Sequence, residues 1–294
     1  MSTPRLSSDA ASLDAPHDGI LHLPDRHIAY RFEGHGDGPV VMLVHGLLAD
    51  LGLWDEVVAR LAESQRILRY DLRGHGGSSA TPAPYTLGML ADDAVALLDA
   101  LAIDRVHFVG TSIGGMIGQQ LGLNHGARLA SLVLAHTAAR QPAPQAWHDR
   151  IAVARAQGLE PLAGPAIQRW LSPAARAAQT DLLAQWTARA ATTSVEGYAG
   201  CAAAIAGLDF ADCLTGIRTP TLVVAGAQDE AIAPELSLEL RQGLPDAAWA
   251  WLEPAAHQSA LECPGRLIAA CTGFWTALPP MTATASRPRP LDER

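Results

Sequence analysis

The chain has 294 residues, a length that fits one large domain or a core with an inserted subdomain. Hydrophobic residues make up 49% of it and charged residues only 17%, so a sizeable buried core is available. The net charge is −9, and all 21 basic residues are Arg and form no cluster, which argues against a nucleic-acid partner.

The two ends of the chain differ from the rest. Residues 1–16 carry one Arg and no apolar segment, so a secretory signal is not expected. Residues 278–294 are rich in Pro, Thr, Ser and Arg, and both ends are predicted to be disordered tails. No apolar run approaches the roughly 18 residues that a membrane-spanning helix needs. We therefore expect a cytoplasmic protein with no membrane partner.

Strand and helix patterns alternate along most of the chain. Residues 20–23 and 27–32 predict an opening hairpin. The elements expected after it are, in chain order, a strand at 40–44, a helix at 54–61, a strand at 66–70, a helix at 87–101, a strand at 106–109, a helix at 116–123, strands at 131–134 and 221–225, a helix at 234–243, a strand at 248–252 and a helix at 264–276. This alternation predicts an α/β fold, with a mostly parallel, doubly wound sheet of about eight strands.

The alternation stops once, between residues 142 and 207. This stretch is rich in Ala, lacks strand patterns and carries three Trp at positions compatible with helices. A helical insertion after a strand of an α/β sheet predicts a lid over the carboxyl ends of the strands, where ligands bind in such folds. Residues 17–141 and 208–277 would then form the core and 142–207 the lid; the alternative is that 142–207 are further helices of the core.

The sequence G-x-S-x-G at residues 110–114 lies between a predicted strand and a predicted helix. In that context it is typical of a nucleophile elbow, a strained turn that exposes a serine. Ser112 would be the nucleophile, and a Cβ at position 110 or 114 is expected to clash. The amide of Ile113 would be free at the start of the helix.

A serine nucleophile needs a base, and the base needs a carboxylate to orient it. In this fold the chain order is Ser, acid, His. His257 follows the last predicted strand, which would place it over the carboxyl edge of the sheet, although a surface-loop histidine is the alternative. Asp229 follows the strand at 221–225 and is the predicted acid, with Glu230 as its neighbouring alternative.

Two amides are needed to bind the negative charge that develops on the substrate oxygen. The amide of Ile113 would supply one, and the amide of Leu47, in the loop after the strand at 40–44, the other. In the same loop His45 is expected to brace the backbone rather than to act as a base. Asp71 and His75 are expected to be structural in the glycine-rich loop at 73–78. The four Cys lack metal-ligand spacing, and neither a cofactor nor a metal is implied.

Together these motifs resemble the α/β-hydrolase superfamily across residues 20–277. Within it the chain is most similar to the 3-oxoadipate enol-lactonases of aromatic catabolism, through the stretches at 50–55, 68–76 and 137–147. The resemblance implies a serine hydrolase that cleaves a small lactone or carboxylic ester through an acyl-enzyme. It also shows two departures: those lactonases tend to carry Ser-Asn-Ser at 44–46 and Asn at His136.

The resemblance further implies a small, anionic substrate. Its carboxylate would need a fixed positive partner, because an unpaired buried charge is costly. Arg140, near Trp147 at the predicted junction of strand and lid, is the first candidate, with a salt bridge at the lid hinge as the alternative. His136 and Leu48 complete the predicted substrate-binding residues.

Other functions remain open at this stage. A general carboxylesterase, a C–C bond hydrolase of ring-fission products and a cofactor-free haloperoxidase-like enzyme would share the same fold. A non-catalytic receptor is disfavoured, because Ser112, Asp229 and His257 all stand in the expected order. A small molecule is the expected partner, and the sequence does not indicate an oligomeric state.

Overall fold

The computed structural model describes residues 5–6 and 16–279. Its strands are β1 (Arg5–Leu6), β2 (His17–His22), β3 (His27–Glu33), β4 (Val40–Val44), β5 (Ile67–Tyr70), β6 (Val106–Thr111), β7 (Leu129–Ala135), β8 (Thr221–Gly226) and β9 (Ala248–Leu252). Its α-helices are α1 (Asp55–Leu61), α2 (Leu87–Ala100), α3 (Ile113–Asn124), α4 (Pro144–Gln157), α5 (Glu160–Gln168), α6 (Pro173–Ala178), α7 (Thr180–Ala191), α8 (Val195–Ala206), α9 (Pro234–Gly243), α10 (Ser259–Glu262) and α11 (Pro264–Ala277). Short 3-10 turns precede α1, β7 and β8.

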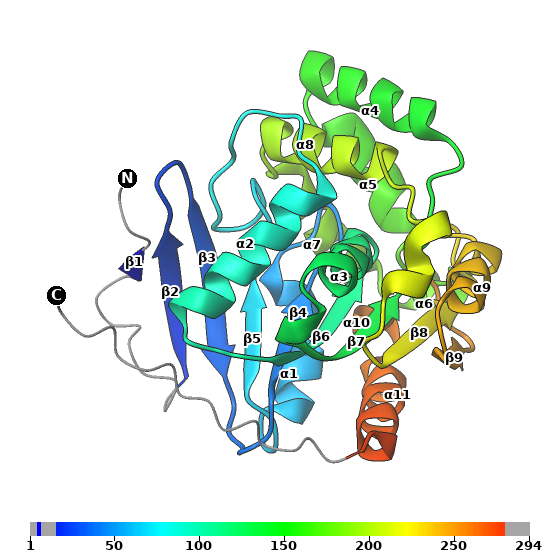
Figure 1. The fold of residues 1–294 in the computed structure, drawn as a ribbon. Coiled ribbons are helices and arrows are strands. Elements are labelled where there is room, and N and C mark those ends of the chain that lie inside the picture. Colours follow the sequence, from blue (N-terminus) through cyan, green and yellow to red (C-terminus); the bar gives the residue numbers. More distant parts are fainter. Residues whose placement is uncertain (1–4, 7–15, 280–294) are drawn as a thin grey trace, which may run out of the picture.

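All described strands join one sheet in the order β1-β2-β3-β5-β4-β6-β7-β8-β9 (Figure 1). The pairings from β1 through β3 to β5 are antiparallel, and those from β5 across to β9 are parallel. Every residue of β4, β5, β7 and β8 is buried. These strands are buried along their whole length because helices cover both faces of the sheet, so neither face is exposed to solvent.

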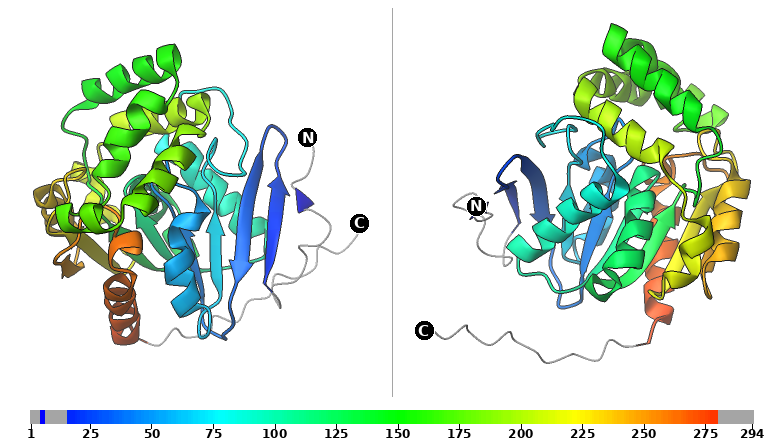
Figure 2. Two further views of the ribbon diagram at one scale, coloured as in Figure 1. Left: turned by 180° about the vertical axis from the view of Figure 1, so that it is seen from behind. Right: turned by 45° about the horizontal axis from the view of Figure 1, so that its top comes forward.

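Helices cover the two faces of the sheet in separate groups. On one face α2, α3 and α9 pack against the large apolar side chains of the strands, and on the other face lie α1 and α11 (Figure 2). The α/β class and the doubly wound parallel sheet are therefore confirmed, and the hairpin predicted at 20–32 is present as β2 and β3.

Residues 144–206 fold into the five helices α4 to α8, and this fully described stretch contains no strand. We call them the lid helices. They lie beyond the carboxyl ends of the parallel strands, with α4, α5 and α8 at the top of Figure 1. Two of these helices have a serine N-cap. The side chains of Ser172 and Ser194 accept hydrogen bonds from first-turn amides of α6 and α8.

The sheet has one strand more than the approximate eight expected. The additional strand β1 lies within residues 1–16, so that segment is not a tail throughout. Two residues are too few to show a strand period. The rest of the tail predicted at 1–15, and residues 280–294 of the other, lie outside the described residues. In the described part of the chain, no helix combines the length and apolar character needed to cross a bilayer.

Candidate active site

Ser112 lies in the turn between β6 and α3 with φ 57° and ψ −120°, a backbone conformation that L-residues rarely adopt. A Cβ on Gly114 would lie 2.4 Å from the carbonyl oxygen of Val44. A Cβ on Gly110 would lie 2.3 Å from the backbone of Gly114. The two glycines are thus required, as expected, and the clashes would be with β4 and with the turn itself.

Hydrogen bonds on both sides hold this turn. The amide of Ser112 donates to the carbonyl oxygen of Ala135 at 2.9 Å, and the hydroxyl of Thr137 donates to the carbonyl oxygen of Ser112 at 2.8 Å. Ser112 is followed directly by α3, so the amide of Ile113 is one of the first-turn N–H groups that have no partner inside the helix. The turn therefore places a hydroxyl next to a free amide.

Asp229 and His257 lie far apart in the sequence and meet in the structure. Nδ1–H of His257 donates to the Asp229 carboxylate, at 2.9 Å from Oδ2 and 3.1 Å from Oδ1. The amides of Ala231 and Ile232 donate to Oδ1, each at 2.9 Å. Burial by itself would raise the pKa of Asp229, but His257 and His136 outweigh it and hold this pKa below its usual range. The result is a fixed carboxylate that orients one histidine.

Glu230, the alternative acid, points elsewhere. Its carboxylate pairs with the guanidinium of Arg176 at 3.1 Å, and the pair is largely exposed. Asp229 is therefore the carboxylate that the structure brings to His257.

The loop after β4 approaches Ser112 closely. A Cβ on Gly46 would lie 3.3 Å from Cβ of Ser112, so a larger residue there would crowd the serine. The next residue, Leu47, lines the same cavity as Ser112. This loop therefore brings Leu47 to the cavity beside Ser112, and the amide of Leu47 remains the predicted second oxyanion donor.

Two buried histidines brace that loop. His45 donates from Nδ1–H to the carbonyl oxygen of Gly46 and accepts the amide of Leu72 on Nε2, at 2.8 and 3.0 Å. His75 accepts the amide of Leu48 on Nε2 at 3.3 Å. Burial lowers the pKa of each imidazole to about 4. Both are neutral near pH 7, as suits a structural brace rather than a base.

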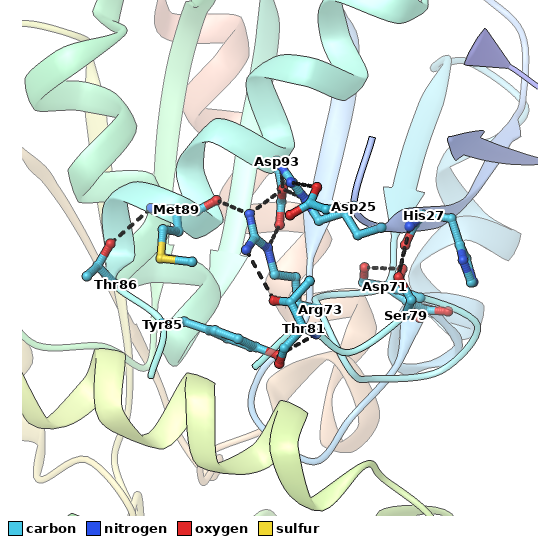
Figure 3. A network of polar contacts seen from close by, with 12 residues as sticks. Asp25, His27, Asp71, Arg73, Ser79, Thr81, Tyr85, Thr86, Met89 and Asp93 are labelled. Atoms are coloured by element: carbon cyan, nitrogen blue, oxygen red, sulfur yellow. Dashed lines mark hydrogen bonds and ion pairs between the residues drawn. The ribbon is translucent and has the colours of Figure 1, made fainter. Parts of the chain in front are cut away.

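A buried ion-pair network anchors the loop that carries His75. Arg73 forms two hydrogen bonds with the carboxylate of Asp93, and the side chain of Arg26 reaches the same carboxylate (Figure 3). The side chains of Arg73 and Asp93 are only 5% and 4% exposed. The guanidinium of Arg73 also lies over the ring of Tyr85. Because His75 donates to the carbonyl oxygen of Arg73, this network extends to the loop that carries Leu47 and Leu48.

Two adjoining cavities, of about 160 and 430 Å³, open beside Ser112 and His257. Both cavities are lined by side chains of the lid helices, among them Trp147 of α4. Leu48 lines the larger one. The predicted nucleophile, base and three of the residues predicted to lie near substrate (Leu47, Leu48 and Trp147) thus share one space.

Two arginines that were not among the predicted site residues also line these cavities. They are Arg150 of α4 and Arg169 directly after α5. The guanidinium of Arg150 stacks on the ring of Trp147, 4.6 Å from its centroid. Nε of Arg169 is buried without a hydrogen-bond partner, and burial together with nearby Arg150 lowers the pKa of Arg169. Neither guanidinium has a carboxylate within ion-pair distance among the described residues.

A sequence signal for Arg150 exists, because it follows Trp147 by three residues and so shares its face of a helix. Arg169 has no such signal, since it lies where α5 ends.

Two of the predicted substrate-binding residues do not reach the cavities. Arg140 pairs with Glu239 at 2.9 Å, and both side chains are about half exposed. Its backbone joins Asp209 across the base of the lid helices, so the hinge salt bridge is the correct interpretation. His136 is only 1% exposed and lies behind Asp229, where its Nε2 is 2.8 Å from the hydroxyl of Ser259.

The lid helices are tied to the loops of both Asp229 and His257. The amide of Gln258 donates to the carbonyl oxygen of Trp170 at 2.9 Å. Glu262 accepts hydrogen bonds from the amide and hydroxyl of Ser172 and from the amide of Ala256. Arg176 pairs with Glu230, the residue that follows Asp229 in the sequence. Residues 170–176 therefore anchor the lid helices to these two loops.

No group of three or more His, Cys, Asp or Glu in the described ranges is arranged to hold a metal ion. The polar side chains that line the cavities are those of Ser112, His257, Arg150, Arg169, Tyr198 and Gln141. This set suits acyl transfer from an ester or lactone to a serine.

Comparison with known proteins identifies the family of the chain. Residues 39–264 match the family described as alpha/beta hydrolase fold. The chain is 36% identical over 209 residues to 3-oxoadipate enol-lactonase 2 of Acinetobacter baylyi, covering 71% of this chain and 78% of that one. A solved enol-lactonase from Burkholderia xenovorans LB400 is 34% identical with a TM-score of 0.84, covering 87% of this chain and 99% of that one. A solved hydrolase from Pseudomonas aeruginosa PA01 has the same TM-score at 35% identity, covering 89% and 99%. The predicted resemblance is thereby confirmed, and the chain belongs to the α/β-hydrolase family.

Proposed function

We propose that this hydrolase cleaves a small lactone or carboxylic ester that carries a carboxylate, with an enol-lactone as the leading candidate. One observation carries the proposal: the cavities beside Ser112 and His257 are lined by two guanidinium groups, and no carboxylate of the described residues lies within ion-pair distance of either. The relatives named as enol-lactonases are the reason for choosing an enol-lactone as the candidate substrate.

In the proposed mechanism Ser112 attacks the substrate carbonyl. Asp229 holds Nδ1–H of His257, which leaves Nε2 to take the proton from the serine hydroxyl. The amides of Leu47 and Ile113 stabilise the oxyanion, an effect worth about 3 kcal/mol for each donor. Collapse gives an acyl-enzyme and a leaving group protonated by His257, and water activated by the same imidazole then releases the acid.

The two arginines supply the binding energy for an anion. Burial, and after it the positive charge of nearby Arg150, lowers the pKa of Arg169. A substrate carboxylate between them would relieve the repulsion between the two guanidinium groups and give Nε of Arg169 the hydrogen-bond partner that it lacks. Trp147, stacked under Arg150, would support the apolar part of the same substrate.

The mechanism is tested by removing its parts singly and together. We expect Ser112→Ala and His257→Ala each to lower kcat by about 10⁴-fold or more, and the double variant to be scarcely worse, because the residues act as a unit. Near-normal turnover of Ser112→Ala on a p-nitrophenyl ester would refute the proposed nucleophile.

The substrate class is tested by comparing a carboxylate-bearing lactone with its neutral methyl ester. The wild type should prefer the acid, and Arg150→Ala or Arg169→Ala should each lower kcat/KM for the acid by about 10- to 150-fold, the range for a hydrogen bond to a charged group. The neutral ester should be little affected. Arg140→Ala is the matched control, since that guanidinium is engaged on the surface. A wild type that prefers the neutral ester would indicate a general carboxylesterase instead.

A further inference from the structure

His136 is a buried imidazole that the proposed mechanism does not use. It follows β7 with φ 50°, a left-handed conformation, and is 1% exposed. Its Nε2 lies 2.8 Å from the hydroxyl of Ser259, and its Nδ1 lies 3.5 Å from Oδ2 of Asp229. Nδ1 is fully shielded from water and forms no hydrogen bond in the structure, and Oδ2 of Asp229 faces it at 3.5 Å. The same carboxylate therefore faces two imidazoles, His257 on one side and His136 on the other.

The surroundings of His136 define where its proton lies. The ionisable groups that face it are Asp229 after β8, His257 in the loop before α10, and Glu262 at the end of α10. Burial lowers the pKa of His136, so the ring is neutral near pH 7. If Nε2 carried the proton, the lone pair of Nδ1 would point at the Asp229 carboxylate and repel it. With the proton on Nδ1, the hydroxyl of Ser259 donates to Nε2 and Asp229 gains a donor.

We propose that His136 is a positioning residue that holds Asp229 through Nδ1–H and limits how strongly this carboxylate attracts the proton of His257. The inference rests on the proposed roles of Ser112, Asp229 and His257. Two amides restrain Oδ1, and His136 adds a restraint on Oδ2, which also accepts the hydrogen bond from His257. A carboxylate that shares its charge with a second donor stabilises the imidazolium that forms on His257 less.

The first test needs no variant. NMR of the full wild-type chain with ¹⁵N-labelled histidine distinguishes the two neutral ring forms. We expect His136, assigned by the loss of its signals in His136→Asn, to carry its proton on Nδ1 at neutral pH. A proton on Nε2 would overturn the proposal, whatever the variants do.

The second test compares two variants in the pH profile of kcat/KM. His136→Ala removes the donor; His136→Asn keeps an amide donor, and Asn tolerates a left-handed backbone. We expect His136→Ala to move the acid limb up by about 0.5–1 pH unit and to lower kcat about tenfold with KM unchanged, since one hydrogen bond to the carboxylate is lost. His136→Asn should return the acid limb toward that of the wild type.

Two controls separate this inference from its foundation. If Ser112→Ala retains turnover, the proposed mechanism itself has failed. If Ser112→Ala is inactive while His136→Ala has the wild-type acid limb, only the inference fails, and His136 is a packing residue. Thermal unfolding of each variant shows whether it is folded in the assay. If His136→Ala does not fold, the NMR result on the wild type decides.

Discussion

The buried imidazole of His75 makes the stability of this protein depend on pH in a way that a single substitution should remove. Burial, together with neighbouring His45, lowers its pKa to about 4, whereas in the unfolded chain a histidine has a pKa of about 6.5. Below pH 6.5 the unfolded state therefore binds a proton that the native state does not. The stability that is present above about pH 6.5 is therefore lost as the pH falls toward 4. At pH 5 the burial of neutral His75 lowers the free energy of unfolding by about 2 kcal/mol.

The assay is urea unfolding at about pH 7.5 and about pH 5, from which the difference in the free energy of unfolding is taken for each protein. His75→Gln keeps an oxygen that can accept the amide of Leu48, so it should lose about 2 kcal/mol less than the wild type on acidification. His148→Gln, at an exposed position of α4, is the control and should match the wild type. An equal loss in His75→Gln and in the wild type would refute the reasoning.

Two further predictions concern the supports of the site. Asp93→Ala leaves the guanidinium of Arg73 buried and unpaired, and should lower the free energy of unfolding by about 3–5 kcal/mol in urea; a loss comparable to that of an exposed pair such as Arg140→Ala would contradict it. Gly114→Ala should abolish esterase activity, because its Cβ would lie 2.4 Å from a carbonyl oxygen of β4. Gly273→Ala in α11, where no atom lies within 4 Å of the new Cβ, should keep full activity and raise stability by up to about 1 kcal/mol. Active Gly114→Ala would disprove the steric argument.

Much of the fold and of the candidate site could be predicted from the sequence, because the signals are local. Buried strands such as β4 are short apolar runs, and the serine turn is specified by glycines that the backbone requires. Asp229 and His257 could be found because each follows a strand of a parallel sheet, and such strands end at one edge. Their contact is the physical consequence of that topology.

The structure places the side chain of Arg140 away from the cavities, because a position in the chain does not define the direction of a side chain. Arg140 lies close to the cavities in sequence, but it points outward to Glu239 on the neighbouring α9. Arg150 lies on α4 and Arg169 directly after α5, and the rotation of these helices depends on packing within the lid. The sequence position of His136 likewise does not show which way its side chain points. In the structure it faces Asp229 and Ser259 and does not line the cavities.

The hydrogen bonds of residues 170–176 to the loops of Asp229 and His257 divide the lid into two parts with different tolerance to change. A substitution near Trp170 or Ser172 disturbs the alignment of the reacting groups along with the shape of the cavity. In α4, by contrast, only Ala154 is fully buried. Substrate range can therefore diverge through α4, around Trp147 and Arg150, while the chemistry below stays the same.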